Sequence, residues 1–125
     1  MSTLRVNSLL NAAGTDTPAI DGLAKAWVNF NGTGTVAIRA AFNVSSITDN
    51  GTGTYVVNFT NALSNANYSA VFSTSTSSGS TVVSAIMNNQ AGIVTPTTTT
   101  LALAIFARSD ATARDSEHCC LSIFR

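Results

Sequence analysis

Charged residues are scarce in this 125-residue chain, in which six basic and six acidic residues make up 10% of the sequence and cancel. A typical soluble domain is about 25% charged. Without a basic run, the sequence lacks the electrostatic footprint of a protein that binds nucleic acid or anionic lipid. The polar residues are mainly Ser, Thr and Asn, whose short neutral side chains suit a protein that packs against copies of itself.

The chain also lacks segments that would direct it into a membrane. Its first residues contain no apolar core of signal-peptide length, and no apolar run approaches the roughly 18 residues of a membrane-spanning helix. We therefore expect a protein that is made and folded in a cytoplasm, with no membrane insertion. Its cysteines, Cys119 and Cys120, are adjacent and in a strand would point to opposite faces. We expect them to be thiols, with Cys119 packed as a small apolar residue.

Residues that carry catalysis are few. His118 is the only histidine, and with Asp115 and Glu117 it lacks the ligand spacing of a zinc site. No pair of carboxylates suggests a glycosidase, and the Gly-Lys-Ser/Thr signature of a P-loop is missing. The sequence therefore predicts no enzyme, no catalytic residue, no metal site and no cofactor.

The pentapeptide NGTGT occurs twice, at 31–35 and at 50–54. A phosphate-binding loop would need a helix after the glycines, whose N-terminal N–H groups hold the anion. Each copy is followed instead by an alternating run typical of a strand. Asn-Gly between two such runs is a strong hairpin signal, because both residues tolerate positive φ. We interpret both copies as hairpin turns.

Apolar and polar residues alternate with a period of two along most of the chain, which is typical of strands with one buried face. The shared faces that this alternation predicts are Val36, Ile38, Ala40 and Phe42; Tyr55, Val57 and Phe59; Tyr68, Ala70 and Phe72; and Cys119, Leu121 and Ile123. The run 101–106 is apolar on both faces, as expected of a central strand. Turn signals recur about every ten residues and no stretch favours a helix. The predicted fold is all-β, an antiparallel, jelly-roll-like β-sandwich of about six to eight strands.

Two segments, WVNFNGTGTVAIR and FNVSSITDNGTGTYVVNFT, are long and distinctive. With the opening STLRVNSLLNAAGTDTP and the close CCLSIFR, they resemble the C-terminal knob domain of bacteriophage tail-fibre and fibre-like virion proteins, found in phages of aquatic bacteria and in prophages. The resemblance covers most of the chain and is weaker over 66–115. It implies a homotrimeric virion protein, either a short tail fibre or knob that contacts the host cell surface, or a capsid decoration or head-fibre protein.

The resemblance also divides the chain into an N-terminal anchoring arm, 1–23, and a sandwich domain, 24–125. Because only about 23 residues precede the domain, it implies a short knob rather than a long fibre. Residues 3–10 alternate and are predicted to add as a strand to a neighbouring subunit or another virion protein, with a frayed end as the alternative. The candidate anchoring residues are Leu4, Val6, Leu9 and Leu10.

If the protein binds a host glycan or protein, we expect the contact at loop tips, since loops vary while the scaffold holds them. The loops in question are 73–80, 88–92 and 109–117. Candidate receptor-facing residues are Ser77, Ser78, Asn88, Asn89, Gln90, Asp110, Asp115 and Glu117. Trp27 and Tyr68 could stack on a sugar, but aromatics in alternating runs are more often core, and we interpret both as core residues.

Overall fold

A computed structural model of the chain describes residues 23–75, 83–87, 96–107 and 112–125, with 83–87 described as backbone alone. Among these residues there are eight strands and no helix, and hence no helix of the length and apolarity that a membrane span requires. The strands are β1 (Ala24–Asn31), β2 (Ala37–Phe42), β3 (Val44–Asp49), β4 (Thr54–Phe59), β5 (Ser69–Ser75), β6 (Val83–Met87), β7 (Thr100–Ala107) and β8 (His118–Phe124).

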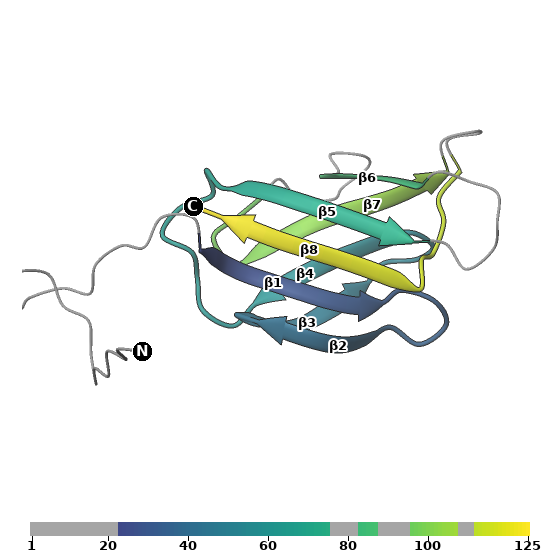
Figure 1. Cartoon of the computed structure of the whole chain (residues 1–125), viewed down its shortest axis with the longest axis horizontal. Helices are drawn as coiled ribbons and strands as arrows, with labels where there is room; N and C mark the ends of the chain where they lie inside the picture. The colour runs from purple at the N-terminus through teal and green to yellow at the C-terminus, as the bar shows by residue number, and fades with distance from the viewer. Residues whose placement is uncertain (1–22, 76–82, 88–95, 108–111) are drawn as a thin grey trace, which may run out of the picture.

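The strands form two four-stranded antiparallel sheets that pack against each other (Figure 1). Sheet A has the order β2-β1-β8-β5, and sheet B has the order β3-β4-β7-β6. The predicted antiparallel β-sandwich is therefore confirmed. The run that is apolar on both faces is β7, which lies between β4 and β6, as a central strand should.

The core lies between the sheets and is built from alternate residues of four strands. The inward side chains of the two central strands of each sheet are all buried: Ala26, Val28 and Phe30; Tyr55, Val57 and Phe59; Leu101, Leu103 and Ile105; and Cys119, Leu121 and Ile123. Burying a large apolar side chain stabilises the fold by about 1.5–3 kcal/mol. The faces predicted for β4 and β8 are confirmed, and Ala70 and Phe72 of β5 are partly buried against this core.

The face predicted for β2 is wrong, because a bulge divides the strand. Asn29 of β1 is opposite Ala40, but the next residue, Phe30, is opposite Ile38, so that Arg39 is the extra residue. Cross-strand partners share a face of the sheet. Ile38 therefore lies on the inner face with Phe30, whereas Ala40 and Phe42 lie on the outer face. An alternating pattern does not reveal such a bulge.

β2 and β3 are almost continuous and are separated by Asn43 alone, where the chain passes from sheet A to sheet B. Asn43 has a φ of 55°, in the left-handed region that Asn tolerates better than most residues. Its side-chain Nδ2 donates to the carbonyls of Lys25 (3.1 Å) and Asn61 (3.2 Å), and its Oδ1 accepts from the Asn61 N–H (2.8 Å). One side chain thus ties the corner to β1 and to the loop after β4.

Replacing Asn43 should show how much this corner contributes to stability. Asn43→Ala removes three hydrogen bonds and leaves a Cβ residue at positive φ, so we expect the free energy of unfolding to fall by about 2–4 kcal/mol. Asn43→Gly removes the same bonds without the backbone strain and should be about 1 kcal/mol milder. Urea unfolding of the three proteins measures both. If both variants stay within about 0.5 kcal/mol of the parent, the side chain does not hold the corner.

Candidate functional site

The sandwich has two chemically different ends. At the hairpin end, β1 turns into β2 and β3 into β4; at the arm end, β1 begins and β8 finishes (Figure 1). The acidic side chains that the structure describes, Asp49, Asp115 and Glu117, belong to the hairpin end, where they flank the β3–β4 turn and the start of β8. The arm end carries Lys25 and Arg125 and an open cleft.

Both NGTGT copies are turns at the hairpin end, as predicted, but neither is a two-residue Asn-Gly hairpin. Positive φ occurs at Gly34 (61°) in the first copy, and at Gly51 (114°) and Gly53 (67°) in the second. In each turn, the side chain of a residue near the start of the turn accepts hydrogen bonds from the residues that follow. Asn31 Oδ1 accepts from the Thr33 N–H and hydroxyl, and Asp49 Oδ1 accepts from the Gly51 N–H.

The two copies use their glycines in opposite order. In the first copy, Gly32 is the enclosed position: a Cβ there would lie 2.7 Å from the Tyr55 hydroxyl, whereas Gly34 has nothing within 4 Å. In the second copy the first glycine, Gly51, is the open one, and a Cβ on Gly53 would lie 2.6 Å from the Ile105 carbonyl oxygen. Each loop therefore has one enclosed glycine and one open glycine.

Tyr55 and Asp115 join the two loops. The buried Tyr55 hydroxyl lies 2.8 Å from the Gly32 carbonyl and 2.7 Å from Asp115 Oδ1, and its single proton can be donated to either. The same carboxylate oxygen accepts from the Gly53 N–H at 2.7 Å. The Tyr55 ring also packs edge-to-face on Phe30, with centroids 5.3 Å apart. The cluster links the enclosed glycines of both loops to the segment before β8.

The electrostatics of this cluster indicate a structural role. Burial, and then the hydrogen bond to the Asp115 carboxylate, raise the pKa of Tyr55 far above its usual range. The phenol therefore stays protonated at neutral pH and serves as a hydrogen-bond donor. Asp115, which the sequence analysis placed among receptor-facing residues, is exposed but has one oxygen engaged in these internal contacts.

Two of the three positive-φ glycines, Gly34 and Gly53, have similar φ and offer a matched test of the enclosed position. Gly34→Ala adds a methyl group in open space and should lower the free energy of unfolding by about 1–2 kcal/mol, the strain of the left-handed backbone. Gly53→Ala adds the same strain and a clash with the backbone of residues 105 and 114, for a further ~1–3 kcal/mol. Thermal or urea unfolding measures the difference. If both variants lose the same free energy of unfolding, the second loop relaxes around the added methyl group at no cost, and the enclosed position is not a packing constraint.

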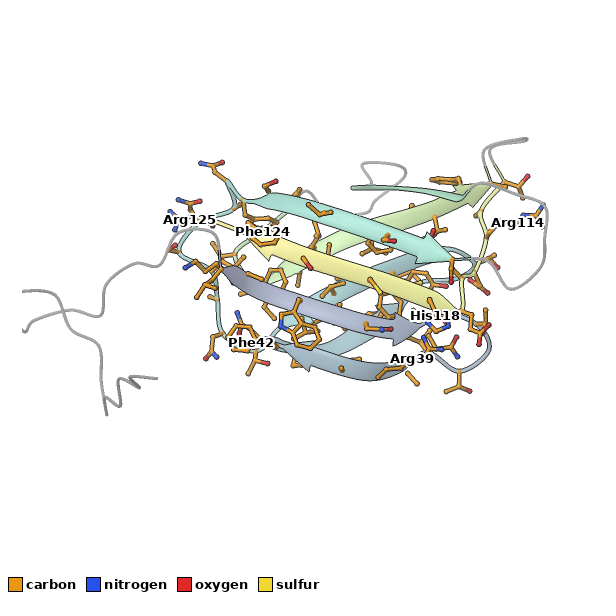
Figure 2. All side chains as sticks on the ribbon, viewed as in Figure 1. Arg39, Phe42, Arg114, His118, Phe124 and Arg125 are labelled. Atoms are coloured by element: carbon orange, nitrogen blue, oxygen red, sulfur yellow. The ribbon has the colours of Figure 1, made fainter. Side chains whose placement is uncertain are left out.

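Arg39 and His118 meet at the hairpin end (Figure 2). Arg39 Nη1 donates to the Glu117 carbonyl (2.5 Å) and lies 3.2 Å from His118 Nδ1, so the bulge in β2 directs this guanidinium onto the start of β8. Within the described ranges, no three His, Cys, Asp or Glu side chains form a group that could hold a metal ion. Glu117, another predicted receptor-facing residue, is exposed.

The other predicted receptor-facing residues, Ser77, Ser78, Asn88, Asn89, Gln90 and Asp110, lie outside the described residues, as do Leu4, Val6, Leu9 and Leu10 of the arm. The cysteines behave as expected, since both are free thiols and Cys119 is buried while Cys120 is partly exposed. Burial raises the pKa of Cys119 to about 11, which keeps it a neutral core residue at physiological pH.

A largely apolar row, interrupted by Ser122, crosses the outer face of sheet A. Trp27 of β1 is opposite Phe42 of β2 on one side and Ser122 of β8 on the other, and Ser122 is opposite Val71 of β5. Trp27, Phe42 and Val71 are 37%, 53% and 59% exposed. The interpretation of Trp27 as a core residue is therefore wrong, because it alternates with buried Ala26 and Val28. We call Phe42, Trp27, Ser122 and Val71 the sheet A row.

Tyr68, the other aromatic in question, does join the core. Its ring packs edge-to-face on Phe59 with centroids 6.2 Å apart, and its hydroxyl is 3.3 Å from the carbonyls of both Thr97 and Thr100. Burial raises the pKa of Tyr68. It fastens the segment before β7 to the segment before β5, so it belongs to the scaffold.

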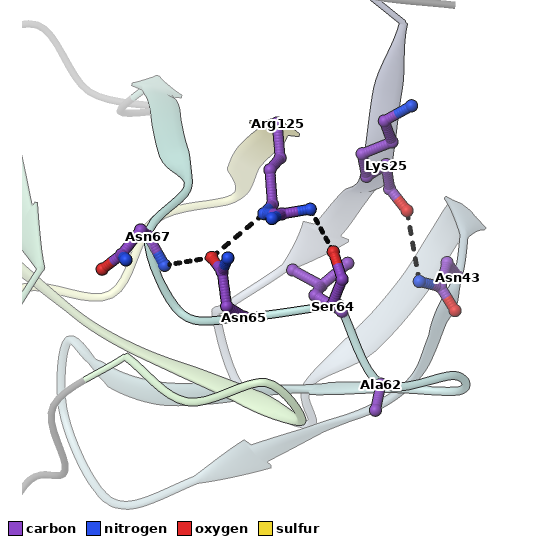
Figure 3. Close-up of a pocket in the computed structure, with 8 residues that line it drawn as sticks. Lys25, Asn43, Ala62, Ser64, Asn65, Asn67 and Arg125 are labelled. Carbon is purple, nitrogen blue, oxygen red and sulfur yellow. Dashed lines mark hydrogen bonds between the residues drawn. The ribbon is translucent and has the colours of Figure 1, made fainter. Parts of the chain in front are cut away.

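An open cleft of about 780 Å³ lies at the arm end (Figure 3). The Arg125 side chain lines one side of the cleft, where its Nε donates to Asn65 Oδ1 at 3.0 Å and its Nη1 donates to the Ser64 hydroxyl. Asn65 Oδ1 also accepts from the Asn67 N–H at 2.9 Å. The lining residues are Lys25, Asn43, Ala62, Leu63, Ser64, Asn65, Asn67 and Arg125.

This cleft could not be predicted from the sequence, because its lining residues come from segments far apart in the chain. The sequence feature that points to it is Asn43, a single turn-forming residue between two alternating runs. No protein-family model matches this chain, and no curated protein or solved structure is significantly similar to it. The likeness to bacteriophage fibre knobs therefore stays a prediction.

Proposed function

We propose that this chain is a bacteriophage virion structural protein, a short homotrimeric tail fibre or knob that is exposed on the particle and contacts the host cell surface. The observation that supports the proposal is the sheet A row, in which three exposed apolar side chains lie on a protein with few charges. An aromatic pair such as Trp27 and Phe42 is typical of the centre of a protein–protein interface. A three-fold assembly that buries this row removes it from water.

The exposed edge strand of sheet A, β2, also supports a protein that associates with copies of itself. β2 is an edge strand, and every residue from Ala37 to Phe42 is exposed. Exposed sheet edges invite pairing with other chains, and a closed symmetric oligomer restricts that pairing to one partner. The bulge at Arg39 interrupts the edge, which disfavours open-ended stacking of sheets.

The polarity of the sandwich agrees with a knob that is anchored at one end. The arm precedes Leu23 and β1, and so joins the arm end. β5 finishes at Ser75 and β7 at Ala107, both at the hairpin end. Residues 73–75 of the predicted receptor loop 73–80 belong to β5, and the described part of loop 109–117 leads into the start of β8 at the same end. The loop 88–92 follows β6, which runs toward the arm end, and is the less favourable of the three for a distal receptor contact. A capsid decoration or head-fibre protein is the alternative role, with the same fold and arm.

Self-association is the first property to measure. We expect the protein to elute as a trimer in size-exclusion chromatography with light scattering, and the double variant Trp27→Ser/Phe42→Ser to weaken association at least about tenfold. Thr48→Ala, an exposed polar change on sheet B, is the control and should leave the trimer intact. Urea unfolding of the double variant checks that the sandwich is preserved. A monomer at micromolar concentration would remove the trimer from the proposal.

The location on the particle separates the two virion roles. Gold-labelled antibody against this protein on intact virions should mark the tail in electron micrographs. Label spread over the head would identify a capsid decoration instead. Virions without label would overturn both roles, and the resemblance in the two NGTGT segments would then carry no functional meaning.

A further inference from the structure

The two Asn-Gly pairs of the chain, Asn31-Gly32 and Asn50-Gly51, have the same sequence but different surroundings. Asparagine before glycine readily loses its side-chain nitrogen, because the glycine has no side chain to keep its backbone nitrogen from attacking the asparagine Cγ. Both pairs belong to the pentapeptide NGTGT, so the residues that follow each asparagine are identical. A difference in reactivity between the two pairs in the folded protein therefore has to come from their environments.

In the first copy, hydrogen bonds hold both residues of the pair. Asn31 Nδ2 donates to the Thr33 carbonyl at 3.0 Å, and Asn31 Oδ1 accepts from the Thr33 N–H and hydroxyl. The Gly32 N–H donates to the Ser116 carbonyl at 2.8 Å, and Gly32 is buried against Tyr55. A backbone carbonyl does not act as a base, and the Asn31 amide would have to leave its bonds to Thr33 before the Gly32 nitrogen could attack it. The fold therefore protects this pair.

In the second copy, the same two residues are open to reaction. Asn50 is exposed, and among the described residues its side-chain amide has no hydrogen-bond partner. A Cβ on Gly51 would have no atom within 4 Å, so the space beside this residue is open. The Gly51 N–H donates to Asp49 Oδ1 at 2.9 Å. That distance lies within the range of about 2.6–3.2 Å in which a general base accepts a proton.

We propose that Asn50 is a site of spontaneous deamidation in the folded protein, with Asp49 as the general base, and that Asn31 is protected. Asp49 Oδ1 takes the proton of the Gly51 N–H as this nitrogen bonds to Asn50 Cγ. The bond between Cγ and Nδ2 then breaks, and the side-chain nitrogen leaves as ammonia with the proton that Asp49 returns. A cyclic succinimide remains. Water opens it to aspartate when it attacks Cγ, and to isoaspartate when it attacks the backbone carbonyl carbon of residue 50.

The modification changes the hairpin end in two ways. Each event adds a negative charge beside Asp49, in a chain whose formal net charge is zero. Isoaspartate also lengthens the backbone inside a loop that two hydrogen bonds close, from the Asn50 N–H to the Thr54 carbonyl and from the Thr54 N–H to the Gly51 carbonyl. The hairpin end therefore gains charge with age, without a cofactor or another protein. This inference concerns the chain alone and does not depend on a place in a virion.

Peptide mapping of the aged full-length protein by mass spectrometry tests the proposal. Arg39 separates the two pairs into different tryptic peptides, so the change from amide to carboxylate can be followed at both sites in one sample. During incubation at neutral pH, we expect Asn50 to react at least about tenfold faster than Asn31 in the folded protein. In guanidinium chloride, which unfolds the chain, the two rates should become similar, because only the environments distinguish the pairs.

Two variants test the role of the base. Asp49→Ser keeps a side chain that can accept from the Gly51 N–H but removes the base, so deamidation of Asn50 should slow at least about tenfold. Glu117→Gln, which removes another carboxylate at the hairpin end, is the matched control and should leave the rate unchanged. Urea unfolding of both variants checks that the sandwich is preserved.

Two results would overturn the proposal: equal rates at Asn31 and Asn50 in the folded parent, or a reaction at Asn50 that occurs only in the unfolded chain. An unchanged rate in Asp49→Ser would overturn the assignment of Asp49 as the base. If Asp49→Ser proves unstable, the comparison of folded and unfolded parent protein decides the question, since it needs no variant.

Discussion

One amide side chain controls how the two sheets meet. Asn43 takes a left-handed backbone conformation between β2 and β3, and its three hydrogen bonds hold the corner to β1 and to the loop after β4. Because the chain changes sheets there with a single residue, β2 and β3 lie at the same side of the sandwich. Asn43 also lines the cleft, so the corner between the two sheets helps to shape the cleft at the arm end.

Much of this architecture follows from alternation alone. The buried faces of β4 and β8 and the central place of β7 could be predicted because each strand needs only its own pattern of apolar residues. The bulge at Arg39 and the exposure of Trp27 could not, because both depend on which strand lies opposite. The contact between Tyr55 and Asp115 joins residues 60 positions apart, and local sequence carries no sign of it.

The charged side chains that the structure describes lie toward the two ends of the sandwich, and the sheet A row crosses the outer face between them. At the hairpin end, Arg39 and Asp115 are engaged in contacts that hold β8 and the two loops. At the arm end, Arg125 is positioned by Ser64 and Asn65 beside an open cleft. The proposed assembly into a trimeric virion protein rests on this arrangement, a largely apolar row on sheet A between two chemically different ends.

The opposite use of glycines in the two NGTGT loops has a consequence for engineering. The two pentapeptides have the same sequence, yet the enclosed glycine is the first one in the first loop (Gly32, next to Tyr55) and the second one in the second loop (Gly53, next to Ile105). The backbone conformation of one loop therefore does not fit the surroundings of the other. At the open glycines, Gly34 and Gly51, an added Cβ has no atom within 4 Å, so residues added there would point away from the packed interior. The repeat thus offers two neighbouring display sites on a single scaffold.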